Sequence, residues 1–209
     1  MNNRLKNIFI ILAFQYCENR TLLEEKWSEI EKAYSESDRY YHNLQHLEHM
    51  FLEFELIQEK VCNKDVMLFA LFYHDLIYDA KRQDNEEASA IKAMECLTQM
   101  LIPKKIKETC SSYILATKSH AISDNEELNI FLDLDLSVFG EDWERYKTFS
   151  ENIRKEYAYY NDVLYNQGRI KVLTHFLTKE SIFKTEKFKD RLEEQARSNM
   201  ERELQDLSN

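Results

Sequence analysis

Glycine and proline are almost absent from this chain. Its 209 residues include two glycines, Gly140 and Gly168, and one proline, Pro103, where an average soluble protein of this length would carry roughly ten or more of each. Tight hairpins and β-sandwiches depend on these residues. Their scarcity argues against strand-rich folds and predicts an all-α fold of long helices joined by short polar turns. The length suits one domain, and we expect residues 1–209 to form a single domain.

The four cysteines are scattered and include no Cys-x-x-Cys pair. They lie in apolar helical patterns, where a free thiol acts as a small hydrophobic side chain. We therefore expect reduced thiols and a cytoplasmic location. Arg4 and Lys6 precede an apolar stretch at residues 8–14, as in a signal peptide, but no small-residue cleavage site follows it. No run reaches the ~18 apolar residues that a membrane span needs, so we expect no membrane partner.

Acidic residues outnumber basic ones along the whole chain, and the formal net charge is −10. A surface of this sign repels the phosphate backbone of nucleic acids. We therefore expect no extended nucleic-acid partner. A small anionic substrate is compatible with this charge if a metal ion and a few cationic side chains reverse the potential locally.

Apolar residues recur with the period of an α-helix through most of the chain. The pattern predicts helices at about residues 23–34, 42–59, 66–77, 84–97, 146–160 and 169–177, with another opened by Pro103. Asp84 and Glu87 have the spacing of a capping box. A last helix at about residues 186–207 would dock on its own chain or on another subunit. The sequence leaves the oligomeric state open.

Residues 130–138 give an ambiguous signal. Leu132, Leu134 and Leu136 alternate with Asp133 and Asp135, as in an edge strand. Taken alone, the two acids are typical of the solvent face of a strand or a helix.

Two other motifs combine residues that bind metal ions. His42 and His46 are four apart and would lie on one face of the helix predicted at 42–59, which suits one metal ion or a metal ion and its substrate. The alternative is that His42 and His46 are partly exposed polar residues that bind no metal ion. His74 and Asp75 stand in a nearly apolar stretch, where burying an imidazole and a carboxylate is unfavourable unless each finds a partner. A divalent cation would satisfy both, and a His–Asp hydrogen bond is the alternative.

The order His, His-Asp, Asp along the chain resembles the signature of the HD superfamily of metal-dependent phosphohydrolases. The chain is most similar to a bacterial branch of predicted phosphohydrolases, over roughly residues 20–207. The segments that carry the similarity are Arg39-Tyr40-Tyr41-His42-Asn43 with His46, Tyr73-His74-Asp75 with Tyr78-Asp79, Asp84-Asn85-Glu86 with Ser89-Ala90, Asp133-Leu134-Asp135-Leu136-Ser137 through Gly140, Ile153-Arg154-Lys155-Glu156-Tyr157, Gly168-Arg169 with Val172-Leu173, and Ala196-Arg197-Ser198-Asn199.

The resemblance implies an HD-type helical bundle that binds a divalent metal ion (Mn, Fe, Mg, Zn, Ni or Co). It implies as ligands His46, His74, Asp75 and Asp135, with Asp133 as the reserve for the last position. Because this last acid normally stands on a helix in the family, the resemblance predicts a helix at residues 130–138.

A second similarity concerns Tyr41-His42-Asn43 followed by His46, which resembles the motif of cyclic-nucleotide phosphodiesterases. In that motif the first histidine protonates the leaving oxygen, which implies His42 as the general acid. The motif ends in Asp-Leu-Ser, which matches Asp135-Leu136-Ser137. The rest of the phosphodiesterase nucleotide pocket is not recognisable, and the acidic pair of alarmone hydrolases does not follow Asp75. Neither specificity is therefore implied.

These residues predict hydrolysis of a small phosphate ester, such as a nucleotide, by water activated on the metal ion. The candidate catalytic residues are His42, Asp75 and Glu86, and the candidate substrate-binding residues are Arg39, Lys118, His120, Arg154 and Arg169. The arginines could form forked hydrogen bonds to phosphate. Two other functions stay open: an idle HD domain that binds a nucleotide as a sensor or scaffold, and di-iron oxygen chemistry, which needs two further histidine ligands.

Overall fold

Helices make up the secondary structure of the computed structural model, which describes residues 2–208. Within this range there are ten α-helices and two 3-10 helices, and no strand. The all-α prediction is therefore confirmed, and residues 130–138 are helical. Among the same residues, none of the helices is long and apolar enough to cross a membrane. No disulfide joins the four cysteines, all of which lie within the described range.

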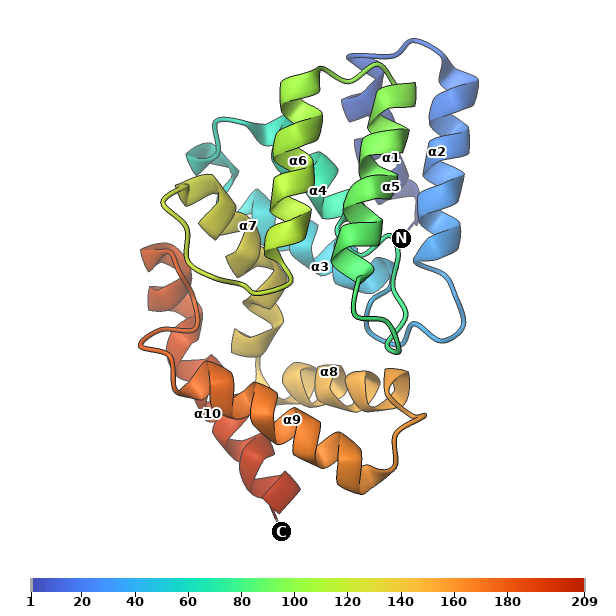
Figure 1. Ribbon diagram of the computed structural model, residues 1–209. Helices are drawn as coiled ribbons and strands as arrows, with labels where there is room; N and C mark the ends of the chain where they lie inside the picture. Colours follow the sequence, from blue (N-terminus) through green and yellow to red (C-terminus); the bar gives the residue numbers. More distant parts are fainter. Residues whose placement is uncertain (1, 209) are drawn as a thin grey trace. The chain divides into compact units, whose positions relative to one another are not determined.

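Contacts divide the chain into two compact units, with the boundary between Ala121 and Ile122. The first contains α1 (Asn2–Phe14), α2 (Arg20–Ala33), α3 (Leu44–Glu55), η1 (Gln58–Lys60), α4 (Lys64–Tyr73), α5 (Asn85–Gln99) and α6 (Lys104–Ala116) (Figure 1). The second contains α7 (Glu126–Leu136), η2 (Ser137–Gly140), α8 (Trp143–Glu156), α9 (Asp162–Leu177) and α10 (Glu186–Ser208). A single domain is the expectation from chain length, whereas the contacts define two compact units.

The apolar helix α4 forms the centre of the first unit. It packs against α1, α3, α5 and α6, and Phe69 through Tyr73 are fully buried. Phe72 meets the ring of Phe9 edge to face at 5.3 Å between centroids and lies 4.7 Å from the ring of Phe51. Aromatic pairs of this kind add to the free energy gained by burying apolar area. The position of the C-terminal end of α4 is thereby fixed by the core.

Packing in the second unit is close around η2 and α10. The helix α10 lies against both η2 and α9, and the Asn199 amide donates to the carbonyl oxygens of Phe139 (2.9 Å) and Glu141 (2.8 Å). A Cβ atom at Gly140 would lie 2.8 Å from the carbonyl oxygen of Leu192, inside van der Waals contact. Glycine at this position therefore permits the approach of α10.

Several helix boundaries differ from the predicted ones. α3 begins two residues later and ends four earlier than predicted, and α8 ends at Glu156 rather than at residue 160. Asp84 occupies the N-cap of α5, but its carboxylate binds the Arg82 guanidinium at 2.9 and 3.0 Å instead of a backbone N–H. The predicted capping box with Glu87 is therefore not formed.

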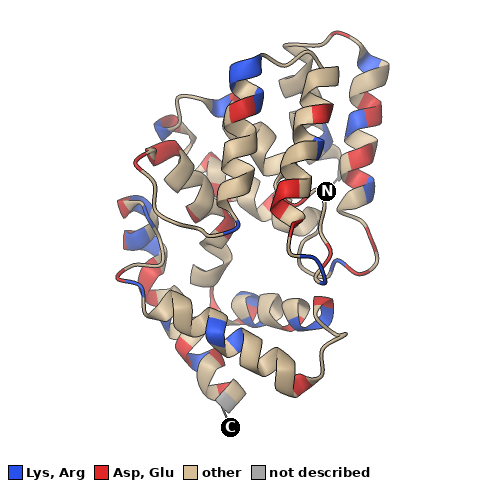
Figure 2. Cartoon of the chain, in the orientation of Figure 1, with Lys and Arg blue, Asp and Glu red and all other residues tan. Residues whose placement is uncertain are grey.

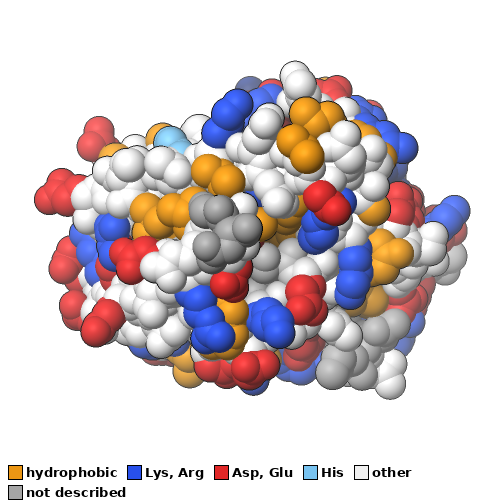
Figure 3. Space-filling view, turned by 90° about the horizontal axis from the view of Figure 1, so that it is seen from below, with side chains coloured by type: hydrophobic (Ala, Val, Ile, Leu, Met, Phe, Trp, Pro, Cys, Tyr) orange, Lys and Arg blue, Asp and Glu red, His pale blue; other side chains and the backbone are white. Residues whose placement is uncertain are grey.

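Charged side chains are distributed over both units. Figure 2 shows Asp and Glu interspersed with Lys and Arg on the helices of each unit. On the face drawn in Figure 3, positive and negative side chains are interspersed with small apolar patches.

Candidate metal centre

The start of α3 positions the first histidine of the site. Asn43 is the N-cap, and its side-chain oxygen accepts the backbone N–H of Gln45 at 2.8 Å. Its amide group donates to the carbonyl oxygen of Tyr40 at 2.9 Å. An asparagine in this role satisfies N–H groups that the first turn of a helix leaves without an intrahelical acceptor. The third residue of the helix is His46, which is buried.

The end of α4 positions the second histidine and the carboxylate. α4 stops at Tyr73, so His74 is its C-cap and Asp75 lies in the turn that follows, at residues 74–77. The imidazole of His74 is buried, and its Nδ1 lies 3.0 Å from the carbonyl oxygen of Leu71. A carbonyl oxygen only accepts hydrogen bonds, so Nδ1 carries the proton and the Nε2 of the neutral ring has a lone pair available.

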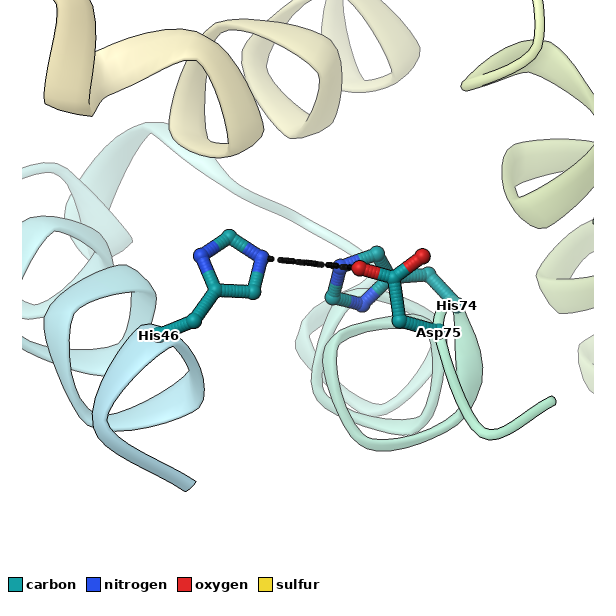
Figure 4. Close-up of side chains that lie close together, drawn as sticks. All are labelled: His46, His74 and Asp75. Carbon is teal, nitrogen blue, oxygen red and sulfur yellow. Dashed lines mark hydrogen bonds and ion pairs between the residues drawn. The ribbon is translucent and has the colours of Figure 1, made fainter. Parts of the chain in front are cut away.

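These three side chains converge on one another, as Figure 4 shows. The Nε2 atoms of His46 and His74 are 3.1 Å apart, and the Oδ2 of Asp75 lies 3.1 Å from His74 Nε2 and 3.8 Å from His46 Nε2. Two ligand atoms at ~2.1 Å from one ion lie about 3.0–3.4 Å apart in octahedral or tetrahedral geometry. The two separations of 3.1 Å match this spacing, the separation of 3.8 Å is wider, and the three residues form a group that could hold a metal ion.

The orientation of His74 supports this interpretation. Histidine ligands commonly donate their second ring N–H to a carbonyl or a carboxylate, which fixes the tautomer and the direction of the lone pair. The bond from His74 Nδ1 to Leu71 has this form. Two imidazoles and one carboxylate are also the ligand types that transition metal ions prefer. The donor set therefore fits a divalent cation.

His42 lies at the edge of the trio, but the predicted geometry for it is wrong. It precedes α3, because Asn43 caps the helix, so His42 and His46 do not share a helix face. The ring of His42 is stacked on Tyr78 at 4.0 Å between centroids, and its Nε2 lies 4.0 Å from Asp75 Oδ2. About one fifth of its side chain (19%) is exposed. It is therefore both near the trio and accessible.

The prediction that His74 and Asp75 stand within an apolar helix is also wrong. The helix ends before them, and 18% of the Asp75 side chain is exposed whereas His74 is almost fully enclosed. The backbone of the turn is instead held by side chains from other segments, among them Tyr34, whose hydroxyl oxygen accepts the N–H of Asp75 at 3.2 Å. No pattern in the local sequence indicates these bonds, since the partner is 41 residues away.

The two acids of α7 differ in their surroundings in the second unit. Asp133 is fully buried and accepts hydrogen bonds from the backbone N–H groups of Lys184 (2.8 Å) and Thr185 (2.8 Å) and from the Thr185 hydroxyl. Burial raises the pKa of Asp133, and the ammonium group of Lys184 opposes this shift. Asp133 thus joins α7 to the start of α10. Asp135, which is half-buried, stays the predicted fourth ligand.

Two of the predicted phosphate-binding arginines are buried and engaged by protein groups. Arg39 donates to the carbonyl oxygens of Asp75 and Leu76. Arg169 forms a forked ion pair with Glu203, at 2.7 Å from Nε and 2.9 Å from Nη2. These contacts give both arginines structural roles.

The third arginine and the remaining candidates lie at the surface or are half-buried. Arg154 donates to the carbonyl oxygens of Tyr157 and Tyr160 and to Asp162. The ammonium group of Lys118 binds the Gln83 carbonyl oxygen at 2.8 Å and the Glu87 carboxylate. The Glu87 carboxylate in turn raises the pKa of Lys118.

The last two candidates are Glu86, at the start of α5, and His120, which follows α6. Glu86 is half-buried in the first turn of α5, and His120 has a backbone φ of 47°, in the left-handed region that few non-glycine residues adopt. Their roles at the site stay predictions.

Comparisons with models of protein families, with curated proteins and with solved structures find no match to this chain.

Proposed function

We propose that the chain is a metal-dependent phosphohydrolase of the HD superfamily. The observation that supports this is the convergence of His46, His74 and Asp75 at 3.1–3.8 Å, with the His74 tautomer set by Leu71. The resemblance in sequence supplies the class of reaction and adds Asp135 as the fourth ligand. A divalent cation bound there would polarise a phosphoryl oxygen and lower the pKa of a water molecule.

The side chains around the trio have distinct tasks in this proposal. His42 protonates the leaving oxygen, and its stack on Tyr78 holds the imidazole at the edge of the trio. General acid catalysis of this kind contributes typically 10²- to 10⁴-fold to the rate. The substrate is a small phosphate ester, such as a nucleotide, because the negative charge of the chain disfavours an extended nucleic acid. The proposed location is the cytoplasm.

The first test is metal content combined with hydrolysis. The wild-type protein and the variants His46→Gln, Asp75→Asn and His175→Gln would be purified and analysed for bound metal. Each would then be assayed on a panel of phosphate mono- and diesters. We expect His46→Gln and Asp75→Asn to lose metal and turnover together. The matched control is His175→Gln, because His175 is an exposed histidine near the end of α9, and it should retain both.

Other results would point to other functions. Metal retained in the wild type without turnover on any ester would favour a nucleotide-binding sensor or scaffold. Iron at two atoms per chain with oxygen consumption would favour di-iron chemistry. A wild-type protein that takes up none of the six candidate ions would contradict the proposal.

A separate variant tests the fourth ligand. Asp135→Asn removes the charge with little change in shape, and we expect weaker metal binding while the metal-free protein stays folded, as verified by circular dichroism. Unchanged metal affinity in this variant would restrict the ligand set to the trio.

A further inference from the structure

Arg39 lies almost entirely inside the first unit, with 2% of its side chain exposed. Its Nη1 donates to the carbonyl oxygen of Asp75 at 2.6 Å, and its Nη2 donates to that of Leu76 at 2.9 Å. Its Nε forms an ion pair with Glu36 at 3.1 Å. A planar guanidinium places these donors in fixed directions. Arg39 thereby holds two successive carbonyl groups of the turn that carries the metal-binding carboxylate.

The same turn is held from other sides. The hydroxyl oxygen of Tyr34 accepts the N–H of Asp75 at 3.2 Å, and Arg39 lies over the Tyr34 ring at 5.3 Å. The hydroxyl of Ser89 accepts the N–H of Ile77 at 3.0 Å and donates to its carbonyl oxygen at 3.1 Å. Side chains from three segments therefore determine where the backbone of Asp75 lies.

The backbone next to Arg39 is linked to the other ligand-bearing segment. The amide group of Asn43 lies 3.4 Å from the Arg39 carbonyl oxygen and 2.9 Å from that of Tyr40. Asn43 caps α3, which carries His46 in its first turn. The segment that contains Arg39 thus contacts both the turn of Asp75 and the cap of the helix of His46.

We propose that Arg39 is a positioning residue of the metal centre. Its guanidinium sets the distance between the carboxylate of Asp75 and the imidazole of His46, and so determines the affinity and coordination geometry for the cation. This inference rests on the proposed function, because it needs a metal ion at the trio. It replaces the expectation that Arg39 contacts phosphate, since its Nη1 and Nη2 groups donate to backbone oxygens and its Nε pairs with Glu36.

The effect of a substitution follows from this geometry. Arg39→Lys keeps the positive charge but loses the two parallel donors, so the turn is no longer held at two carbonyl groups. Loss of a group that orients metal ligands typically weakens metal binding about 10- to 100-fold. We expect a change of that size in the Co²⁺ dissociation constant and a shifted visible absorption band of bound Co²⁺.

The second unit contains a matched control. Arg197 pairs through Nε with Glu193 at 2.8 Å, and its Nη1 and Nη2 donate to the carbonyl oxygens of Leu177 (3.1 Å) and Lys179 (2.9 Å). Like Arg39, Arg197 pairs with a carboxylate through Nε and donates to backbone carbonyl groups through Nη1 and Nη2, among them that of Glu180, although 27% of its side chain is exposed. Arg197→Lys should lower the melting temperature of the metal-free protein without changing the affinity for Co²⁺ or its spectrum.

The experiment is a Co²⁺ titration of the full chain, followed by absorption, on wild type, Arg39→Lys, Arg39→Ala and Arg197→Lys. Circular dichroism would verify that each variant is folded at the temperature used. We expect weaker binding and an altered spectrum in both Arg39 variants, with partial recovery of affinity in Arg39→Ala on addition of guanidinium ion. If the Arg39 variants do not fold, the variant Tyr34→Phe tests the inference instead, because it removes only the hydroxyl oxygen that accepts the Asp75 N–H. We expect a several-fold loss of affinity for Co²⁺ in this variant.

The outcomes separate the two proposals. A wild-type protein that binds no Co²⁺ overturns the proposed function and this inference with it. Tight wild-type binding that is unchanged in Arg39→Lys, or in Tyr34→Phe where that variant decides, overturns the role of Arg39 alone. An equal loss of affinity in Arg197→Lys would also overturn it, because the effect would then be general destabilisation.

Discussion

Each unit buries a group of charged or ionisable side chains, and the two groups are built differently. In the second unit the Glu203 carboxylate accepts hydrogen bonds from Arg169, from the Tyr146 hydroxyl at 2.5 Å and from the Ser150 hydroxyl at 2.7 Å. The guanidinium of Arg169 thus neutralises the charge of Glu203, and hydrogen-bond donors satisfy both of its carboxylate oxygens. The trio of the first unit brings together nitrogen and oxygen atoms that can all act as ligands. The first arrangement serves stability, and the second is suited to a cation.

The ion pair between Glu203 and Arg169 should make a large contribution to the stability of the second unit. Glu203→Gln removes the negative charge and leaves the Arg169 guanidinium buried without its counter-ion. Breaking a buried ion pair on one side costs about 3–5 kcal/mol. We expect a loss of this size in the free energy of unfolding, measured by urea denaturation at pH 7. Glu201→Gln, at an exposed position of the same helix, is the control and should be nearly neutral.

An opposite result would remove the distinction between the two groups. Suppose that Glu203→Gln left the free energy of unfolding unchanged but abolished metal binding, although the candidate ligands are intact. The buried ion pair of the second unit would then belong to the functional site.

The contribution of Glu203 to stability should also depend on pH. Burial alone would raise the pKa of Glu203, but the hydrogen bonds and charge of Arg169 lower it below its ordinary value. The stabilisation is therefore fully present above the pKa of the unfolded chain, about 4.3, and is lost as the pH falls through the lower folded pKa. The difference in unfolding free energy between wild type and Glu203→Gln should narrow below about pH 4.3. A difference that stayed constant to pH 3 would contradict the pKa shift.

The sequence was sufficient to predict those features that depend on local composition. The scarcity of glycine and proline predicted the helical fold, and the pattern of His46 with His74 and Asp75 predicted the three groups that converge. The contribution of Asp135 stays a prediction, as does the assignment to the HD superfamily.

Other features depend on partners far apart in the chain. Arg39 contacts carbonyl groups 36 and 37 residues away, and Arg169 contacts a carboxylate 34 residues away, so a sequence pattern could not separate them from surface arginines. The place of His42 was predictable in principle, since Asn43 is a strong N-cap residue that can begin a helix after it. The periodicity of apolar residues alone predicted α3 as residues 42–59, which is too long at both ends.

The second unit is also stabilised by the close packing of α10 on η2 at Gly140. Gly140→Ala would place a methyl group against the backbone of Leu192 in α10, and backbone atoms cannot move aside as a flexible side chain can. We expect a loss of about 1–3 kcal/mol in the free energy of unfolding.

The other glycine of the chain gives the matched control and the smallest effect. A Cβ atom at Gly168 would meet no atom within 4 Å, and the residue lies inside α9, where alanine is favoured over glycine by about 0.5–1 kcal/mol. Gly168→Ala should therefore raise the melting temperature slightly while Gly140→Ala lowers it, as measured by differential scanning calorimetry. Shifts of the same sign in the two variants would show that the close approach of α10 to η2 does not determine the stability of this unit.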